Sequence, residues 1–284
     1  MRLATFNIYW LGGNQIQRTE EDLGLIARVI ARLDADVLVF QEIVGVAQLQ
    51  TILDQANNLT ARDYKLFDAD QKLLGAAKYG GQKVVVTYDA QRYELVAASP
   101  IGDYVGGFPF GLRLKGKDKV GGGQVTVVGV HLKSGQPSFT DLDSATKRAD
   151  QCQYLQDWVA GNKPVFPAPL PGEHVVILGD FNALYRSDNP DFVGVVSSLD
   201  PLRKGPMAQW WWQEPLADPA GGDRTTSYLE HLLIDYVVLS PSLKERILKP
   251  PTIYAFDQDP EFGAAGLRVS DHRPVVVDID ISAT

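Results

Sequence analysis

Short runs of apolar residues recur along the chain, and the polar residues at their ends constrain the fold more than any other feature of the sequence. The runs lie at residues 3–8, 37–40, 83–88, 124–132, 174–178, 234–239 and 274–281. Several of them are apolar at consecutive positions, which is typical of strands that are buried on both faces. Such strands need cover on each side, so we expect stacked layers.

The positions of the polar residues predict strands that run in both directions. Polar groups just beyond the C-terminal end of a run are Glu42, His131, Asp180 and Asn182. Polar groups at or just before the N-terminal end of a run are Asp235, Asp271 and His272. If all of them serve one site, some strands run towards it and others away from it. This predicts an α/β fold in which two mixed or antiparallel sheets pack face to face with helices outside.

The main alternative is a doubly wound parallel sheet, which strands interleaved with helices normally suggest. We predict three helices, at residues 20–33, 48–59 and 141–159. The first has a capping box at Thr19 and Asp22, followed by apolar residues with a period of 3.6. The sequence has no Gly-rich phosphate loop between a strand and a helix, which argues against the parallel alternative. Residues 115–123, rich in Gly and Lys, are expected to form a hairpin turn.

Composition limits the classes of protein that the chain can belong to. No polar linker interrupts the 284 residues, so we expect a single domain over residues 1–284. The net charge of −8 argues against a broad basic surface for nucleic acid, although a cation held among carboxylates can supply local positive charge. The lone cysteine, Cys152, is expected to be a small core residue, because it has no partner for a disulfide.

Nothing in the sequence indicates a membrane protein. The longest apolar runs are far shorter than a bilayer span, so we expect no transmembrane segment. No signal peptide is visible before the first strand-like run, which suits both a cytoplasmic protein and a secreted protein whose signal has been removed. We also expect a monomer.

The stretch HVVILGDFNAL offers groups for phosphodiester hydrolysis, which needs an activated water and stabilisation of charge on the phosphate oxygens. A buried strand ends there in a tight turn that holds Asp180 and Asn182 side by side at the rim of a sheet. Asp180 could orient or deprotonate water, and Asn182 could donate a hydrogen bond to phosphate. A simple Asx turn explains the same residues without any catalysis, and the motif alone does not decide between the two.

Two residues near the N-terminus are candidates for metal binding. Glu42 lies just beyond an apolar strand, where a carboxylate suits a hard cation such as Mg²⁺, although solvated acids at strand ends are common. Asn7 is an amide inside an apolar strand, and a buried amide needs a partner. A structural bridge and a contact with a site carboxylate are equally compatible with its position.

The candidates for acid–base chemistry lie in the second half of the chain. His272 could transfer a proton if a carboxylate orients its ring, and Asp235 in LLIDYVVLS is the natural partner. Asp271 and His272 are neighbours on one strand, so one of them should belong to a bend if both face the same site. His131 follows a strongly buried strand, where an isolated histidine is more often structural.

Taken together, the segments FNIYW, QE, VHLKS, GDFNA, IDYVVLS and SDHRP, in this order from Thr5 to Val275, resemble the endonuclease/exonuclease/phosphatase superfamily. The resemblance covers nearly the whole chain, and GDFN and SDHRP are its most specific parts. It implies a four-layered α/β sandwich and hydrolysis assisted by Mg²⁺ or Mn²⁺.

The resemblance also implies roles for the candidate residues. Glu42 would bind the metal with help from Asn7 and Asp271. Asp180 and Asn182 would handle water and phosphate, while Asp235 would orient His272. His131 matches the branch of deoxyribonucleases and sphingomyelinases, and the HLKS segment tilts the substrate towards nucleic acid.

Two departures from the pancreatic deoxyribonuclease pattern stand out. Gln82 takes the place of a glutamate that pairs with the first histidine in that enzyme, so His131 is expected to be a neutral donor to phosphate. Val44 takes the place of an arginine that reads the DNA groove. Cutting of double strands in the manner of that enzyme is therefore in doubt.

The leading hypothesis from the sequence is a metal-dependent nuclease. A phosphodiesterase or phosphatase acting on lipid or small phosphorylated substrates is the alternative, favoured by the acidic charge, Val44 and three consecutive tryptophans at residues 210–212. Those rings could stack on bases or contact lipid, but packing over the sandwich is the more common use of aromatic side chains. A non-catalytic binding module is the third hypothesis, although none of the main site residues is missing.

Overall fold

Two sheets dominate the computed structural model, which describes residues 1–66, 81–101, 109–117, 122–135, 142–162, 166–184, 198–213 and 224–282. The order of strands in the first sheet is β11 (Ile247–Ile253), β12 (Val275–Ile279), β1 (Arg2–Leu11), β2 (Val37–Ile43), β4 (Lys83–Asp89) and β3 (Tyr64–Leu66). The order in the second is β5 (Tyr93–Pro100), β6 (Phe110–Gly116), β7 (Gln124–His131), β8 (His174–Asp180), β10 (Asp235–Leu239) and β9 (Trp211–Gln213).

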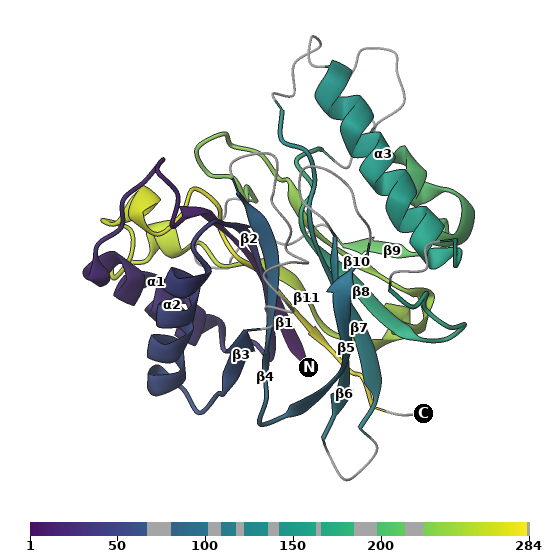
Figure 1. The fold of residues 1–284 in the computed structure, drawn as a ribbon, viewed down its shortest axis with the longest axis horizontal. Helices are drawn as coiled ribbons and strands as arrows, with labels where there is room; N and C mark the ends of the chain where they lie inside the picture. The colour runs from purple at the N-terminus through teal and green to yellow at the C-terminus, as the bar shows by residue number, and fades with distance from the viewer. Residues whose placement is uncertain are drawn as a thin grey trace.

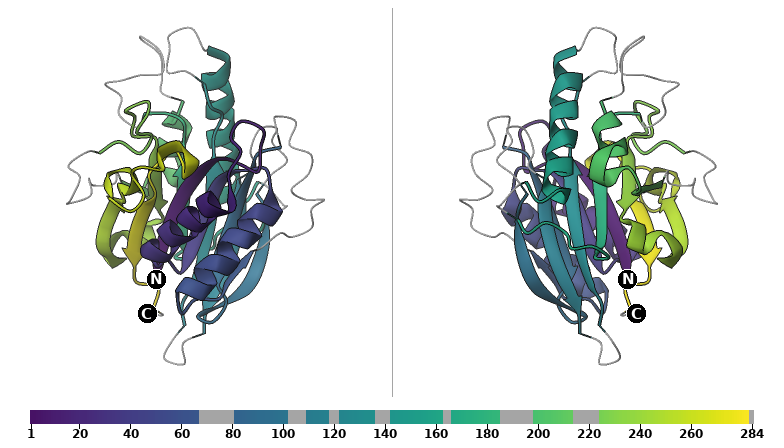
Figure 2. Two further views of the ribbon diagram at one scale, coloured as in Figure 1. Left: turned by 90° about the vertical axis from the view of Figure 1, so that its left-hand side faces the viewer. Right: turned by 90° about the vertical axis from the view of Figure 1, so that its right-hand side faces the viewer.

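The sheets face each other, and helices cover their outer faces (Figures 1 and 2). The helices α1 (Glu20–Leu33) and α2 (Val46–Leu59) lie on the first sheet, and α3 (Leu142–Val159) lies beyond the second. Three buried apolar clusters fill the spaces between the four layers. The predicted four-layered sandwich is therefore confirmed. Short 3-10 helices complete the described chain at Asp200–Arg203, Gly205–Met207, Pro241–Arg246, Phe256–Gln258 and Gly266–Arg268.

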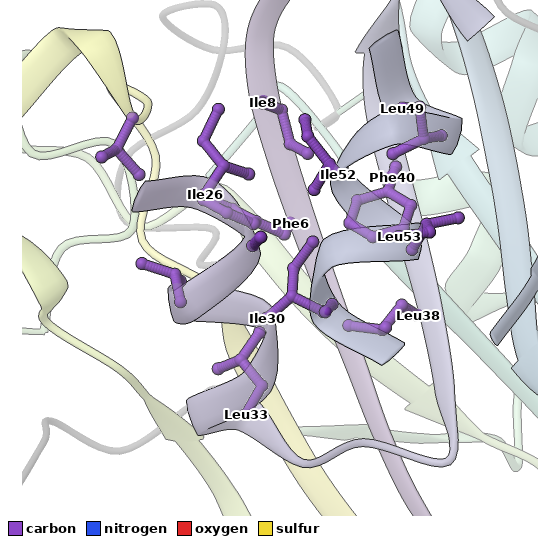
Figure 3. Packing of buried hydrophobic residues seen from close by; sticks show 14 of the residues in the cluster. Phe6, Ile8, Ile26, Ile30, Leu33, Leu38, Phe40, Leu49, Ile52 and Leu53 are labelled. Carbon is purple, nitrogen blue, oxygen red and sulfur yellow. The ribbon is translucent and has the colours of Figure 1, made fainter. Parts of the chain in front are cut away.

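The alternation of side chains along β1 explains why the first sheet needs cover on both faces. Phe6 and Ile8 belong to the cluster beneath α1 and α2, where they meet Ile26 and Ile30 (Figure 3). Leu3 belongs instead to the cluster between the sheets. Since successive strand residues point to opposite faces, a run that is apolar at every position buries both. Each such side chain contributes about 1.5–3 kcal/mol when fully buried.

The sheets approach each other closely where β7 carries a glycine. A Cβ atom at Gly129 would lie 2.6 Å from Val39 Cγ1 and 2.8 Å from Val84 Cγ1 on the facing sheet. Any larger side chain at this position would push the sheets apart, because neither valine lies at the end of a flexible chain. The glycine thus sets the local spacing of the sandwich beneath the candidate site.

The pairing of the strands confirms the prediction of mixed sheets. β1 pairs with β2, and β7 with β8, in parallel, whereas the other described pairs are antiparallel. The C-terminal ends of these four strands lie at the end of the molecule away from the two chain termini (Figure 1). β10 and β12 run the other way, so their first residues reach the same end.

The predicted elements differ from the observed ones mainly at the sheet edges. The capping box of α1 is present, with Thr19 Oγ1 accepting from the backbone N of Asp22 at 3.2 Å. Cys152 is buried, as expected. The strands β3, β5, β6, β9 and β11 were not expected from the sequence. Four of these, β3, β5, β9 and β11, are the edges of the sheets and are short or partly polar, so their pattern is weak.

The tryptophans at 210–212 fall between α3 and the second sheet or at its edge. Trp212 is buried, with its ring centroid 5.2 Å from that of Phe181 and 5.9 Å from that of Tyr236. Trp210 and Trp211 are partly buried against two different clusters. Packing, rather than an exposed stacking platform, accounts for this cluster. The expected turn over 115–123 is flanked by β6 and β7, but residues 118–121 lie outside the described part of the chain.

Candidate active site

The two sheets bring the predicted site residues together at one end of the sandwich. We call this place the mouth and define it by Asn7, Glu42, His131, Asp180, Asp235 and His272. In the second sheet, Asp180 is the register partner of both His131 and Asp235, so three strands place their site groups in one row. In the first sheet, Asn7 and Glu42 come from the paired strands β1 and β2. Hydrogen bonds and ion-pair contacts link the two rows, as described next.

Glu42 is held by donors on both carboxylate oxygens. Its Oε1 accepts from Asn7 Nδ2 at 3.2 Å, and its Oε2 accepts from Trp10 backbone N at 3.1 Å and from Gln82 Nε2 at 2.9 Å. The backbone of Glu42 has φ 59°, which is uncommon for a residue other than glycine. Such a conformation is maintained only where the surrounding structure demands it, which here means turning the carboxylate into the mouth.

Asn7 joins the two sheets. Its Nδ2 donates to Asp180 Oδ2 at 3.1 Å as well as to Glu42, while its buried Oδ1 has no hydrogen-bond partner among the described residues. A buried amide oxygen left unpaired costs free energy unless a ligand satisfies it. Amide and carboxylate oxygens are the donors that hard divalent cations prefer. Asn7 and Glu42 therefore fit the predicted metal site.

Asp271 is the third residue that the sequence predicts as a metal ligand. It lies in a bend next to His272, and Ser270 Oγ approaches its Oδ1 at 3.5 Å. Burial, together with the negative charge of Glu42, raises the pKa of Asp271, even though the charge of His272 lowers it. A cation near Glu42 and Asp271 would relieve this mutual repulsion.

His272 and Asp235 form a buried pair. His272 Nδ1 lies 2.9 Å from Asp235 Oδ2, which leaves Nε2 directed into the mouth at 3.9 Å from Asp180 Oδ2. Burial alone would lower the pKa of His272, but the charge and hydrogen bond of Asp235 raise it to about 10. The imidazole is thus oriented by a carboxylate and favoured in its cationic form.

Asp180 is buried at the end of β8. Its Oδ1 accepts from the backbone N of Asn182 at 2.8 Å. Burial and the nearby charge of Asp235 raise the pKa of Asp180 to about 8, so this carboxyl is poised to take up a proton near neutral pH. The turn predicted at this point is present, with Asn182 at φ 49° and its Nδ2 donating to Leu132 O at 3.0 Å.

His131 lies between the carboxylates of Glu42 and Asp180. Its Nε2 is 3.8 Å from Glu42 Oε1 and 3.7 Å from Asp180 Oδ2, and no described group makes a hydrogen bond to it. Burial lowers its pKa, despite the opposing charge of Glu42, which agrees with the expectation of a neutral imidazole. Gln82, expected beside this histidine, donates to Glu42 instead.

Among the described residues, Asp180, Asp235 and His272 form a different group of potential metal ligands. One ligand atom from each lies within 4.8 Å of the others. The pKa of His272 is raised by Asp235, and the cationic ring that this favours can donate a proton. The chemistry of this group therefore suits proton transfer, whereas the oxygen atoms of Asn7 and Glu42 suit a hard cation.

Several supporting residues were not found by sequence reasoning. Ser270 Oγ donates to Asn7 O at 2.6 Å and accepts from the backbone N of His272 at 3.0 Å. Tyr228 holds the same segment, with its hydroxyl donating to Ser270 O at 2.7 Å. Thr226 Oγ1 accepts from the backbone N of Asp235 at 3.1 Å. Of these residues, the sequence could have indicated only Ser270, because it lies within SDHRP. Tyr228 and Thr226 contact the site from another segment of the chain.

Several solved structures are similar to this chain over nearly its whole length. The human Nocturnin catalytic domain with bound sulfate anion has 17% identity and a TM-score of 0.62, and the match covers 99% of this chain and 94% of that one. Beta toxin from Staphylococcus aureus has 15% identity and a TM-score of 0.60, with 98% and 99% covered. A humanized D. rerio TDP2 has 14% identity and a TM-score of 0.57, with 98% and 97% covered. At these identities the likeness shows the fold alone.

No curated protein matches the sequence. No helix in the described ranges is long and apolar enough to cross a membrane. The family model described as "Endonuclease/Exonuclease/phosphatase family" matches residues 4–272, which confirms the resemblance seen in the sequence. The chain therefore belongs to the endonuclease/exonuclease/phosphatase family, whose members include nucleases and phosphodiesterases and are typically metal-dependent hydrolases.

Proposed function

We propose that this protein is a divalent-metal-dependent nuclease that hydrolyses phosphodiester bonds in DNA or RNA. The observation that carries the proposal is the pairing of His272 with Asp235 at 2.9 Å, with the free imidazole nitrogen facing Asp180. Asn7 connects this group to Glu42, so acid–base groups and metal-type ligands lie at one mouth.

The residues divide the chemistry between them. Glu42, Asn7 and Asp271 would hold Mg²⁺ or Mn²⁺, which when bound polarises a phosphate oxygen and offsets charge that develops on it. Asp180, as its carboxylate, orients water and takes its proton while the water oxygen bonds to phosphorus. The P–O bond to the leaving oxygen breaks, and that oxygen takes a proton from solvent. His272, kept cationic by Asp235, offers Nε2–H to the phosphate. His131 and Asn182 complete the set as neutral hydrogen-bonding groups.

Nucleic acid is the favoured substrate because the HLKS segment and His131 resemble the deoxyribonuclease branch of the family. The matching fold of human Nocturnin was solved with bound sulfate, an anion of the same shape and similar charge as phosphate. A bound cation would supply local positive potential for a polyanion even though the net charge is −8.

The test is nicking of supercoiled plasmid DNA, with single-stranded RNA in parallel, in the presence of Mg²⁺ or Mn²⁺ and with a chelator as control. Replacing His272 by Ala should lower kcat about 10³-fold, because it removes the charged donor to phosphate. Failure of the wild-type protein to cleave either nucleic acid with either metal would overturn the nuclease assignment.

A phosphodiesterase acting on lipid or small phosphoesters is the second candidate. Val44, two residues after Glu42, and the acidic charge favour it, and the fold of beta toxin matches nearly as well as that of Nocturnin. Sphingomyelin and bis-p-nitrophenyl phosphate should be assayed beside the nucleic acids under identical conditions. Turnover of sphingomyelin alone would select this candidate, whereas metal binding with no turnover of any phosphoester would indicate a binding module.

A further inference from the structure

We infer that Gln82 is a positioning residue for metal binding: its amide fixes the rotation of the Glu42 carboxylate so that one oxygen remains for the cation. This inference rests on the proposed function, since it assumes that Glu42 is a metal ligand. It adds a role that the family resemblance did not assign to Gln82.

The contacts of Glu42 show how this positioning works. Oε2 accepts two N–H groups, from Gln82 Nε2 at 2.9 Å and from Trp10 backbone N at 3.1 Å. Oε1 accepts a single, longer bond from Asn7 Nδ2 at 3.2 Å and faces His131 Nε2 at 3.8 Å. The oxygen with the single hydrogen bond, Oε1, is therefore the one that faces His131, and Oε2 is held by its two donors.

Gln82 is the one side-chain donor on that better-bonded oxygen among the described residues. The Trp10 donor is part of the backbone, and any residue except proline would supply it. A glutamate side chain has three rotatable bonds, so one backbone hydrogen bond leaves it considerable freedom. The second donor restricts the carboxylate before the cation arrives, which lowers the entropy lost on binding.

At position 82 the chemical group at the end of the side chain matters as well as the length of the side chain. A carboxylate here would lie within hydrogen-bond distance of Glu42 Oε2 without a proton to donate, and like charges would push the two side chains apart. An amide supplies the N–H without adding negative charge. The deoxyribonuclease pattern has a glutamate at this position that pairs with a histidine. This chain instead has a glutamine that pairs with Glu42, the proposed metal ligand.

The experiment measures Mn²⁺ affinity directly, from the loss of the free-ion electron paramagnetic resonance signal on titration of protein. Gln82→Met keeps the length of the side chain but removes the donor, and Gln82→Asn keeps the amide but shortens its reach. Both should raise the dissociation constant about tenfold, the lower end of the effect of outer-shell partners on metal affinity. The melting temperature of the metal-free variants should stay within about 2 °C of wild type, because Gln82 is only half-buried.

Gln50→Met is the matched control, since Gln50 Nε2 donates to Asp54 Oδ1 at 2.8 Å on the exposed face of α2. It removes the same kind of amide–carboxylate bond away from the mouth and should leave Mn²⁺ affinity unchanged. Glu42→Gln should abolish tight binding. If it does so while both Gln82 variants bind within twofold of wild type, the inference about Gln82 is wrong and the metal site stands. If Glu42→Gln binds as wild type does, the proposed metal site itself fails.

Discussion

At the scale of single residues, the mouth separates two groups that differ in charge. The Asn7–Glu42 side has a fixed carboxylate and an amide oxygen with no partner in the part of the chain that the structure describes. The Asp235–His272 side has a carboxylate paired with an imidazole that is favoured in its cationic form. Asp180 lies between them and contacts both. In the proposed function, charge that develops on the phosphate would lie between two sources of positive potential, the bound cation and the His272 ring.

Replacing Asp235 by Asn should weaken catalysis without removing the histidine. The loss of the charge next to Nδ1 leaves burial to dominate, so the pKa of His272 should fall from about 10. We expect kcat to fall about 10²–10³-fold. Steady-state kinetics on plasmid DNA and NMR titration of the His272 ring check the two effects. An unchanged histidine pKa would contradict the assigned pairing.

At the scale of elements, the backbone at strand ends decides where the side chains point. Glu42 at φ 59° and Asn182 at φ 49° both occupy the left-handed region at the end of a strand. Such residues change the direction of the chain just where a regular strand would have aimed every second side chain into the core. The site is therefore built from irregular strand ends supported by regular ladders.

Gly179 should be among the least replaceable residues of β8. It has φ +148°, and a Cβ atom would lie 2.1 Å from Val130 O on the paired strand β7. Gly179→Ala should cost about 3 kcal/mol in the free energy of unfolding and displace Asp180, because the clash is with backbone. Urea unfolding provides the measurement.

Gly172→Ala is the control for Gly179→Ala. Gly172 also has a positive φ, of +81°, but nothing lies within 4 Å of an added Cβ. This variant should pay only the backbone cost of about 1–2 kcal/mol. Equal destabilisation by the two alanines would show that the contact with Val130 does not matter.

The start of α1 offers a second prediction at this scale. Thr19→Ala removes the oxygen that accepts from the backbone N of Asp22 and should cost about 1 kcal/mol. Thr51→Ala, at an exposed position within α2, removes a hydroxyl that only bonds back to Ala47 O. Because alanine is the better helix former, this control should be neutral or slightly stabilising. Thermal unfolding followed by circular dichroism distinguishes the two.

At the scale of the whole molecule, the two ends of the chain are joined in the first sheet. β1 pairs with β12, and the N-terminal amine donates to Ile279 O at 2.7 Å. Arg2 Nε and Asp278 Oδ1 are 2.8 Å apart across the same ladder. At the other end of this ladder Thr5 pairs with Val275, so closing the sheet fixes the segment that carries His272 beside the strand that carries Asn7.

The Arg2–Asp278 pair predicts a pH dependence of stability. Its hydrogen bond lowers the pKa of Asp278 in the folded state, so the stabilisation is present above the unfolded pKa near 4 and is lost as pH falls through the folded value. Arg2→Gln should cost about 1 kcal/mol at pH 7, a small value because solvent screens the partly exposed Arg2. Urea unfolding should show this difference shrinking as the pH falls below about 4 towards the lowered pKa of Asp278. A difference that does not shrink over this range would contradict the ionic origin.

Much of the architecture was predictable because it depends on local pattern. The buried strands, the first helix with its cap and the mixed direction of the sheets all follow from apolar runs and the residues that end them. The edge strands β3, β9 and β11 were not predictable, since short or partly polar runs are stabilised by their neighbours rather than by their own composition. The single domain over residues 1–284 and the monomeric state remain predictions.

The candidate residues of the site could be named from the sequence, but their partners could not. GDFN and SDHRP identify Asp180 and His272, because tight turns at the ends of buried strands limit where such side chains can lie. The sequence also anticipated the pairing of His272 with Asp235. It placed Gln82 beside His131, whereas the structure places it on Glu42, since Gln82 precedes β4 and its reach depends on how β4 packs beside β2.

The sequence by itself determined the layers, the direction of the strands and the chemical groups available, because periodicity and residue type act over a few neighbours. Only the tertiary structure decided which oxygen of Glu42 faces the mouth, that Asn7 joins the two sheets, and that Ser270 and Tyr228 hold the segment carrying His272. These contacts join residues far apart in the chain. Their geometry depends on ladder register and on left-handed backbone at strand ends, which local pattern does not specify.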